Sequence, residues 1–285
     1  MKLIVRADDV GYTLVHNIGT FRSFEEGIST HVDVMLDSPG TEDALLYSKA
    51  HPWLSVGWHA HLWNTPVANP KLIPSLIDKR GRFKGRHDRK ARDTFVYEEC
   101  LIELRAELDR CIAILGRVPD TAGFHPGDSP MDRAMKAVIE EYGLVTGFMT
   151  THGFGRTRPA DEKYLSRDII CVDPSLQYPG ASSKEFDKFP DYSPMAFYKS
   201  YFTEEMFASN TTYVTPWHPG YVDELVLESS VTLARIVDVE GLCSDEMKQW
   251  IIDHKVELVT FRDAIYGTHE YQNHLKLLGS PLYIG

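Results

Sequence analysis

The sequence predicts an α/β protein folded as an irregular, TIM-like (β/α) barrel. Short apolar runs of strand length alternate along the chain with amphipathic helix patterns, the order expected for a parallel sheet with right-handed crossovers. About eight such runs fit into 285 residues, a length typical of one closed α/β barrel. No G-x-G-x-x-G follows the first run, which argues against a dinucleotide-binding sheet. We therefore expect a single domain over residues 1–285.

Each predicted strand is a short apolar run bounded by turn residues or by the start of a helix pattern. Such runs are too short for helices, and they are buried when they belong to a parallel sheet. In chain order the predicted strands are Leu3–Arg6, His31–Leu36, Leu54–His61, Thr121–His125, Leu144–Met149, Asp168–Val172, Thr211–Trp217 and Val256–Thr260.

Helix patterns fill most of the intervals between these strands, with Gly or Pro near their ends and Ser or Pro near their starts. The predicted helices are Leu14–Glu26, Thr41–Ala50, Phe95–Leu115, one that opens at Asp128-Ser129-Pro130 and ends before Gly143, and one capped by Ser244. Two regions differ from this pattern. Residues 62–93 are expected to be irregular, and the region of about 152–210 is poor in helix pattern and is expected to form an insertion-like departure from an ideal barrel.

Composition narrows the class of protein. The 41 acidic residues outnumber the 30 basic ones and give a net charge of −11, which argues against binding to nucleic acid or an anionic membrane. Only three consecutive apolar residues, Leu3–Val5, stand near the N-terminus, too few for a secretory signal, and no apolar run approaches the ~20 residues of a membrane helix. The four cysteines are widely spaced without a C-x-x-C, so we expect reduced thiols and a cytoplasmic protein.

Acidic and imidazole side chains follow several of the predicted strands. Because the carboxyl ends of the strands in an α/β barrel meet on one face, residues far apart in sequence are expected to converge there. The candidates are Asp8 and Asp9 after the first strand, His59 and His61 at the end of the third, His125 at the end of the fourth, and His218 after the strand that ends at Trp217.

These residue types are suited to a divalent metal ion. Neutral imidazole and carboxylate both bind such ions, and a set of three protein ligands leaves positions for water and substrate. Successive residues at a strand end point in different directions, so Asp8 and Asp9 are not expected to bind the same ion. One carboxylate is expected to bind the metal while the other stays free as a base.

Four segments, in this order, resemble the motifs of the YdjC-like carbohydrate deacetylases, a family that includes the chitooligosaccharide deacetylases. They are Arg6-Ala7-Asp8-Asp9-Val10-Gly11, Gly57-Trp58-His59-Ala60-His61-Leu62, Phe124-His125-Pro126 and His218-Pro219-Gly220-Tyr221-Val222-Asp223. The chain departs from the family pattern in two places. Arg6 stands where the family usually has Asn, and of a His-rich motif only the first histidine, His125, remains.

The resemblance implies an irregular (β/α) barrel that holds one divalent ion, Mg²⁺ in the family, with Zn²⁺ also suited to the donors. Carried over residue by residue, it places the metal ligands at Asp9, His59 and His125. It makes Asp8 the base that takes a proton from the attacking water and His218 the acid that protonates the leaving amine. Two roles stay open: His61 is a further ligand or a neighbour of the ligands, and Asp223 orients His218 or caps a helix.

The implied function is hydrolysis of the N-acetyl group of an amino sugar or short chitooligosaccharide, phosphorylated or not. Two alternatives remain from the residues alone: a metal-dependent phosphoesterase, and a metal-stabilised sugar-binding protein without catalysis. Each would take a small carbohydrate or phosphate ester as its partner. No nucleic-acid or membrane partner is expected, and a homo-oligomer is left open.

Two further stretches have unusual composition. Residues 79–92 contain eight basic residues, which indicate either a solvated loop or a phosphate-binding segment: Lys79, Arg80, Arg82, Lys84, Arg86, Arg89, Lys90 and Arg92. Residues 178–202 contain eight aromatic residues and are expected to line a sugar groove or an oligomer contact. Trp63 and Trp217 flank the site motifs and either stack on sugar rings or pack in the core.

Overall fold

Seven parallel strands form the central sheet. The computed structural model describes residues 1–86, 89–123, 127–146, 169–174, 191–228 and 233–285. The strands follow the order β4-β3-β2-β1-β6-β5 across the sheet, and β7 pairs with the start of β1. Their bounds are Lys2–Val10 for β1, His31–Val34 for β2, Ser55–Trp58 for β3, Thr121–Ala122 for β4, Ile169–Cys171 for β5, Thr212–Trp217 for β6 and Glu257–Leu258 for β7. The predicted α/β class with a parallel sheet is confirmed.

The described strands make an open, curled sheet, which is compatible with the expected irregular barrel but is not a closed TIM barrel. A closed barrel requires every strand to have two neighbours. Here β5 pairs with β6 alone among the described strands, and β4 at the other end pairs with β3 and, on its far side, makes a single described bridge from Thr121 to Val145. That bridge is what the structure describes of the predicted strand Leu144–Met149, whose last three residues lie outside the described part of the chain.

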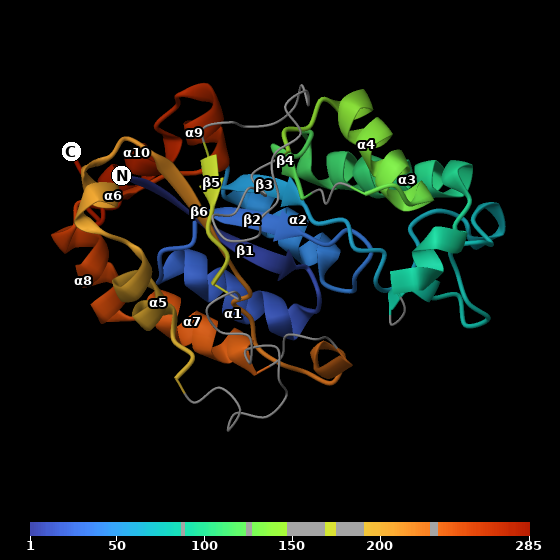
Figure 1. The fold of residues 1–285 in the computed structure, drawn as a ribbon, viewed down its shortest axis with the longest axis horizontal. Coiled ribbons are helices and arrows are strands. Elements are labelled where there is room, and N and C mark those ends of the chain that lie inside the picture. Colours follow the sequence, from blue (N-terminus) through green and yellow to red (C-terminus); the bar gives the residue numbers. More distant parts are fainter. Residues whose placement is uncertain (87–88, 124–126, 147–168, 175–190, 229–232) are drawn as a thin grey trace.

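Helices surround this sheet. Their bounds are Leu14–Glu25 for α1, Thr41–Ala50 for α2, Tyr97–Leu115 for α3, Pro130–Tyr142 for α4, Pro194–Tyr201 for α5, Glu204–Ala208 for α6, Ala234–Cys243 for α7, Asp245–Asp253 for α8, Phe261–Tyr266 for α9 and Glu270–Leu277 for α10. In Figure 1, α1 and α7 lie side by side below the sheet, while α3 and α4 pack together at the upper right of the view, beyond β4. Both termini lie at the left end of the view, near α6 and α10.

Local capping signals place several of these helices where the sequence predicts them. The Thr13 side chain accepts a hydrogen bond from the His16 N–H at the start of α1. Ser129 and Asp132 form a reciprocal capping box at the start of α4. Gly116 ends α3 in the left-handed conformation with φ of 84°, a backbone geometry that a residue with a Cβ disfavours.

The region of about 152–210 contains more regular structure than we expected. Besides β5 it contains α5 and α6, and the Ser193 side chain caps α5 with Pro194 at its first position. Its described aromatic residues pack inside the protein, because Tyr198 stacks on Trp217 and meets Trp250 edge-on. Phe197, Tyr198 and Phe202 are buried, so the expectation that they line a sugar groove or an oligomer contact is wrong. Tyr178, Phe186 and Phe189 lie outside the described residues.

No helix in the described part of the chain is both long and apolar enough to span a membrane. The four cysteines are free thiols and all are buried.

Candidate functional site

The candidate site begins at an irregularity in β1, the strand in the middle of the sheet. Ala7 pairs with Val32 and Val10 with Val34, so Asp8 and Asp9 together stand opposite the single residue Asp33. Such a two-against-one bulge turns side chains away from the regular alternation of a strand. Asp9 has a φ of 59°, a left-handed conformation that is uncommon outside glycine. The bulge therefore presents two adjacent carboxylates at the carboxyl end of the central strand.

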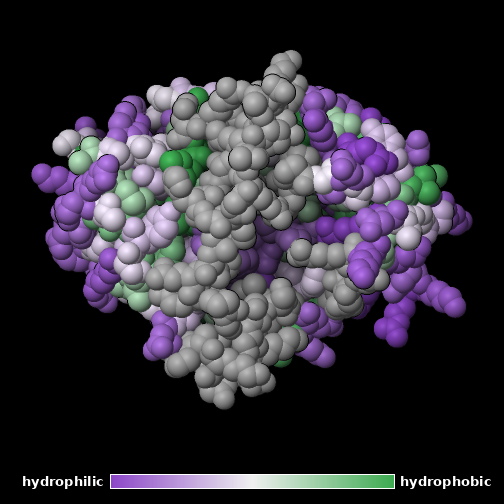
Figure 2. All heavy atoms as spheres, in the orientation of Figure 1, coloured by the Kyte–Doolittle hydropathy of each residue, from purple (hydrophilic) through white to green (hydrophobic). Residues whose placement is uncertain are grey.

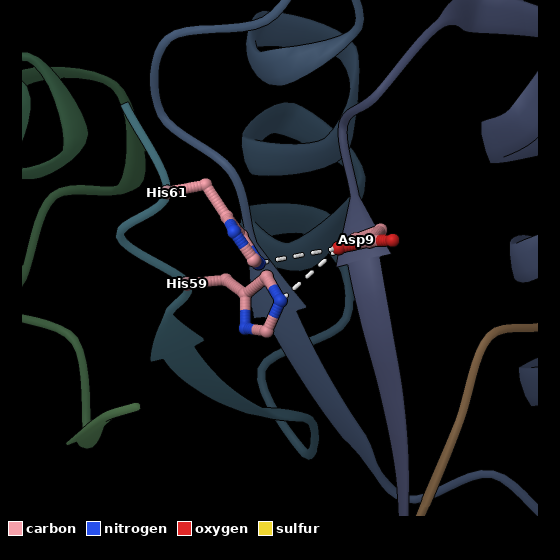
Figure 3. A group of neighbouring side chains, drawn as sticks. All are labelled: Asp9, His59 and His61. Atoms are coloured by element: carbon pink, nitrogen blue, oxygen red, sulfur yellow. Dashed lines mark ion pairs between the residues drawn. The ribbon is translucent and has the colours of Figure 1, made fainter. Parts of the chain in front are cut away.

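Two histidines that follow β3 lie next to Asp9. His59 Nε2 is 3.1 Å and His61 Nε2 is 3.5 Å from Asp9 Oδ1. Figure 3 shows both imidazoles pointing toward this carboxylate, and one donor atom from each of the three residues lies within 4.8 Å of the others. Their side chains are 14%, 15% and 34% exposed for Asp9, His59 and His61, so solvent reaches the cluster. Two imidazole nitrogens and one carboxylate oxygen are donors suited to a divalent ion.

Asp33 fixes the orientation of His59. The His59 Nδ1–H donates to Asp33 Oδ2 at 2.7 Å, which leaves Nε2 turned toward Asp9. A carboxylate behind a histidine in this way sets its tautomer and ring orientation in metal sites. Burial alone acts against the charged imidazole, but Asp33 and Asp9 raise the pKa of His59 to about 10. Without a metal the ring is therefore protonated at neutral pH and bridges two carboxylates.

Arg235 holds the other oxygen of Asp9. Its Nη2 is 2.6 Å from Asp9 Oδ2, and the Arg235 side chain is 1% exposed. Burial acts to raise the pKa of Asp9, but the charge of Arg235 and the contact with His59 keep it well below the ordinary value. Asp9 is thus an ionised carboxylate with one oxygen bound to an arginine and one facing the two histidines.

Asp8 has a different environment. Arg6 Nε donates to Asp8 Oδ1 at 2.5 Å and Arg6 Nη2 donates to Asp8 Oδ2 at 2.7 Å, so both carboxylate oxygens face the same guanidinium. The pair is buried, with side-chain exposures of 7% and 6%, and Asp33 Oδ2 lies 3.9 Å from Arg6 Nε. Burial disfavours the charged guanidinium, but the charges of Asp8 and Asp33 raise the pKa of Arg6 above its usual value.

His218 follows β6, the strand that pairs with β1 up to Ala7 and Trp217. Its backbone N–H donates to Asp238 Oδ2 at 2.9 Å. Burial lowers the pKa of the His218 imidazole, while the charges of Asp9 and Asp8 act in the opposite direction and Arg235 lowers it further. Both aspartates and Arg235 thus act on the His218 imidazole, and its role as the acid stays a prediction.

Two buried carboxylates accept hydrogen bonds from the backbone of the segment after β3. Asp37 Oδ2 accepts the backbone N–H groups of Trp63 at 2.5 Å and Asn64 at 2.8 Å. Glu103 on α3 accepts from Val67 and Ala68 at 2.8 and 3.0 Å. Burial raises the pKa of Glu103 to about 7 against the effect of these two hydrogen bonds, and Asp37 adds to the rise. These contacts fix the chain that carries His59, His61 and Trp63.

The structure separates the two tryptophans that flank the motifs. Trp217 is 1% exposed and belongs to the core. Trp63 is half-buried, and its indole N–H donates to the Tyr12 hydroxyl at 2.5 Å, near the start of α1. Of the pair, Trp63 is thus the more exposed to solvent. Asp223 Oδ1 accepts the Val226 N–H at 3.0 Å and so caps a short 3-10 turn, which favours the capping role over orientation of His218.

In its described part, the basic segment of residues 79–92 contacts the backbone of His61 through Arg92. Arg92 Nη2 donates to the His61 carbonyl at 2.6 Å. Lys84 Nζ donates to the carbonyls of Pro74 and Ser75, while Arg80 and Arg82 are exposed. In Figure 2, strongly hydrophilic residues gather in a recess near the middle of this face, in the region where Figure 1 shows the end of β1.

The structure brings together Asp9, His59 and His61, with Asp8, Asp33, Arg235 and His218 around them. His125 lies outside the described residues, so the ligand set of Asp9, His59 and His125 stays a prediction. Our sequence analysis missed Asp33 and Arg235. An acid inside the short apolar run His31–Leu36 was a signal for Asp33, since such a residue is buried and needs a partner. No local signal marks Arg235, which meets Asp9 from 226 residues away.

A comparison with known protein families decides the relationship of this chain. The model of the YdjC-like protein family matches residues 2–253, which is most of the sequence. The chain belongs to the YdjC-like family. The resemblance seen in the four sequence motifs is thereby confirmed.

Curated members of the YdjC-like family match along nearly the whole chain. A carbohydrate deacetylase from Brevibacillus brevis is 32% identical over 283 residues, covering 92% of this chain and 99% of the relative. A chitooligosaccharide deacetylase from Serratia marcescens is 25% identical, covering 92% and 98%. The crystal structure of a candidate cellobiose-phosphate cleavage protein from Enterococcus faecalis superposes with a TM-score of 0.68 at 22% identity, covering 92% of this chain and 98% of that one. The last match supports the fold alone.

Proposed function

We propose that this protein is a metal-dependent carbohydrate deacetylase that hydrolyses the N-acetyl group of an amino sugar or a short chitooligosaccharide. One observation carries the proposal: Asp9, His59 and His61 present one carboxylate and two imidazole donors at the carboxyl end of the sheet. The relatives named as deacetylases, aligned with 92% of the chain, give the reaction class that suits such a cluster.

The donors fit a divalent ion. The proposed ligands are Asp9 and His59, with His125 as the third, and His61 lies where it contacts the same carboxylate oxygen. The family resemblance implies Mg²⁺, whereas a set with two imidazoles suits Zn²⁺ better, because Mg²⁺ prefers oxygen donors. A divalent ion in this site would supply Lewis-acid polarisation of the carbonyl and stabilise negative charge on its oxygen.

The residues of the chain divide the proton transfers between them. Asp8 is proposed as the acceptor of the proton from the attacking water, and Arg6 fixes the orientation of its carboxylate through two hydrogen bonds. His218, on the neighbouring strand end, is proposed to hold the proton that goes to the leaving amine. Trp63 is proposed to stack on a sugar ring, since it is half-buried and lies two residues after His61 in the segment that follows β3.

The basic segment supports a phosphorylated substrate as the finer form of this proposal. Arg92 connects residues 79–92 to the His61 carbonyl, so exposed bases such as Arg80 and Arg82 belong to a segment tied to the site. Clustered arginine and lysine side chains are effective phosphate partners even on a protein of negative net charge.

The deciding experiment joins metal analysis of the purified protein to an acetate-release screen. The substrates are N-acetylated mono- and disaccharides, each with and without a 6-phosphate. We expect one equivalent of a divalent ion and acetate release from at least one amino sugar that stops on chelation. Two metal equivalents with release of phosphate would instead support a phosphoesterase. Tight sugar binding without turnover would support a non-catalytic sugar-binding protein.

The same screen tests the role of the basic segment. Neutralising Arg80 and Arg82, which are both exposed, should raise KM several-fold for a phosphorylated substrate and leave KM for the unphosphorylated sugar unchanged. Equal effects on KM for the two substrates would indicate that the segment is a solvated loop that does not bind phosphate.

A further inference from the structure

Helix α7 carries two buried ionisable residues one turn apart. Arg235 and Asp238 are each 1% exposed. Residues three positions apart lie on the same face of a helix, so both point into the protein from one side of α7. Burying a charge is costly unless it is paired or hydrogen-bonded, so the partners of these two residues show what the arrangement is for.

Both residues bind the ends of the two central strands. Arg235 Nη2 contacts Asp9 Oδ2 at 2.6 Å at the end of β1. Asp238 Oδ2 accepts the His218 N–H at 2.9 Å just after β6. Because Ala7 and Trp217 are paired neighbours in the sheet, these two contacts lie on adjacent strand ends. One face of α7 therefore touches the proposed metal ligand and the proposed proton donor together.

A buried hydrogen-bond chain extends the same connection. Arg235 Nη1 is 3.0 Å from His16 Nε2, and His16 Nδ1 is 3.3 Å from the Thr20 hydroxyl. The Thr20 hydroxyl donates to the carbonyl of Pro219, the residue after His218, at 2.5 Å. His16 and Thr20 on α1 thus connect Arg235, which binds Asp9, to the backbone next to His218.

We propose that Arg235 and Asp238 are positioning residues that set where Asp9 and His218 stand relative to one another. The proposal rests on the proposed function for the roles of those two residues. Arg235 occupies one Asp9 oxygen, which leaves the other for the ion, and it restrains an aspartate whose φ of 59° is otherwise disfavoured. Asp238 anchors the backbone of His218 and is itself fixed by the Tyr192 hydroxyl at 2.5 Å.

The two residues are expected to give different signatures when they are changed. Arg235→Met should weaken metal binding by about tenfold or more, the usual effect of removing a partner of a ligand, and kcat should fall with it. Arg235→Lys keeps one charged donor and should recover part of the metal affinity. Asp238→Ala should lower kcat while metal affinity stays that of the wild type. Asp238→Asn retains an acceptor for the His218 N–H and should restore most of kcat.

A matched control lies on the same pair of helices. Glu240 on α7, whose side chain is 59% exposed, accepts from Arg22 on α1 at 2.6 Å. Glu240→Gln weakens this contact but keeps the Arg22 hydrogen bond to the Tyr221 hydroxyl, so it should leave both metal affinity and kcat unchanged. It separates a loss of the α1–α7 contact in general from a loss of the contacts at Arg235 and Asp238.

The experiment measures metal affinity by equilibrium dialysis, kcat on the released acetate, and the ring-nitrogen signals of His218 by NMR. We expect the His218 signals to shift in Asp238→Ala and to stay near wild type in Asp238→Asn. The proposal is overturned if Arg235→Lys and Arg235→Met keep wild-type metal affinity, or if Asp238→Ala leaves the His218 signals unchanged. If the wild-type protein releases no acetate, the proposed function fails, while the dialysis and NMR results still decide the positioning roles.

Discussion

The two aspartates at the end of β1 are adjacent and each meets a buried arginine, yet the two pairs differ in geometry. Arg6 engages both oxygens of Asp8, at 2.5 and 2.7 Å. Arg235 engages one oxygen of Asp9 and leaves the other facing His59 and His61. The two aspartates therefore differ in how many of their oxygens an arginine occupies, although Asp8 also belongs to a second group of possible metal ligands with Asp33 and His59.

The largest expected effect separates the two aspartates by function. Asp8→Asn removes a proton acceptor without changing its size, so turnover should fall by about two to four decades while the metal stays bound. Asp9→Asn should instead weaken metal binding, with activity partly recovered at high metal concentration. Acetate-release kinetics and elemental analysis measure both effects. Loss of metal in Asp8→Asn together with its retention in Asp9→Asn would exchange the two roles.

A second prediction concerns the third ligand beside Asp9. His125→Ala should abolish tight metal binding with the fold intact, whereas His61→Ala should retain the ion at reduced affinity, because His61 Nε2 is the more distant imidazole at 3.5 Å. Elemental analysis after dialysis measures the metal content, and circular dichroism confirms the fold. A wild-type metal content in His125→Ala would assign the third position to His61.

The Arg6–Asp8 pair gives a prediction about stability. Arg6→Gln leaves a buried carboxylate without its counter-ion, and breaking such a pair usually costs about 3–5 kcal/mol of unfolding free energy. The control is Arg105→Gln, which breaks a pair with Glu141 whose side chains are 44% and 43% exposed. That change should cost about 0–1 kcal/mol. Urea unfolding measures both, and equal losses would contradict the assignment of Arg6 as the buried counter-ion of Asp8.

The sequence predicts the local parts of this molecule well because local chemistry determines them. Capping by Thr13 and Ser129 and the left-handed Gly143 set helix limits within a few residues, and Thr41–Ala50 is confirmed at both ends. Ser193-Pro194 is a start signal of the same kind as Ser129-Pro130, yet the aromatic composition around α5 led us to expect a sugar groove or an oligomer contact. Closure of the sheet depends on pairing between distant strands, which no local pattern specifies.

For the candidate site, too, the sequence predicts one part and not another. The rule that strand ends converge correctly predicts that Asp9 and His59 meet, although 50 positions separate them in the sequence. It does not predict which side chain occupies which oxygen. Those contacts depend on the bulge at Asp8 and Asp9 and on Arg235, a residue brought in by packing of α7 against α1.

The last prediction uses pH to test the environment of Asp9. In the metal-free protein, Asp33 and Asp9 raise the pKa of His59 to about 10, so a metal ion must displace the proton of His59 at neutral pH. Metal affinity should therefore rise with pH, by about tenfold per pH unit for one displaced proton, across the range below that pKa. Equilibrium dialysis between about pH 6 and 9 measures this slope.

In Asp33→Asn the imidazole of His59 loses its strongest counter-charge, and the pKa of His59 should fall toward the ordinary value of about 6.5. The slope should then flatten near pH 8 while Asp9 and Arg235 remain paired, because a neutral His59 has no proton to release. An unchanged slope in Asp33→Asn would show that the displaced proton comes from another group and that Asp33 does not control His59.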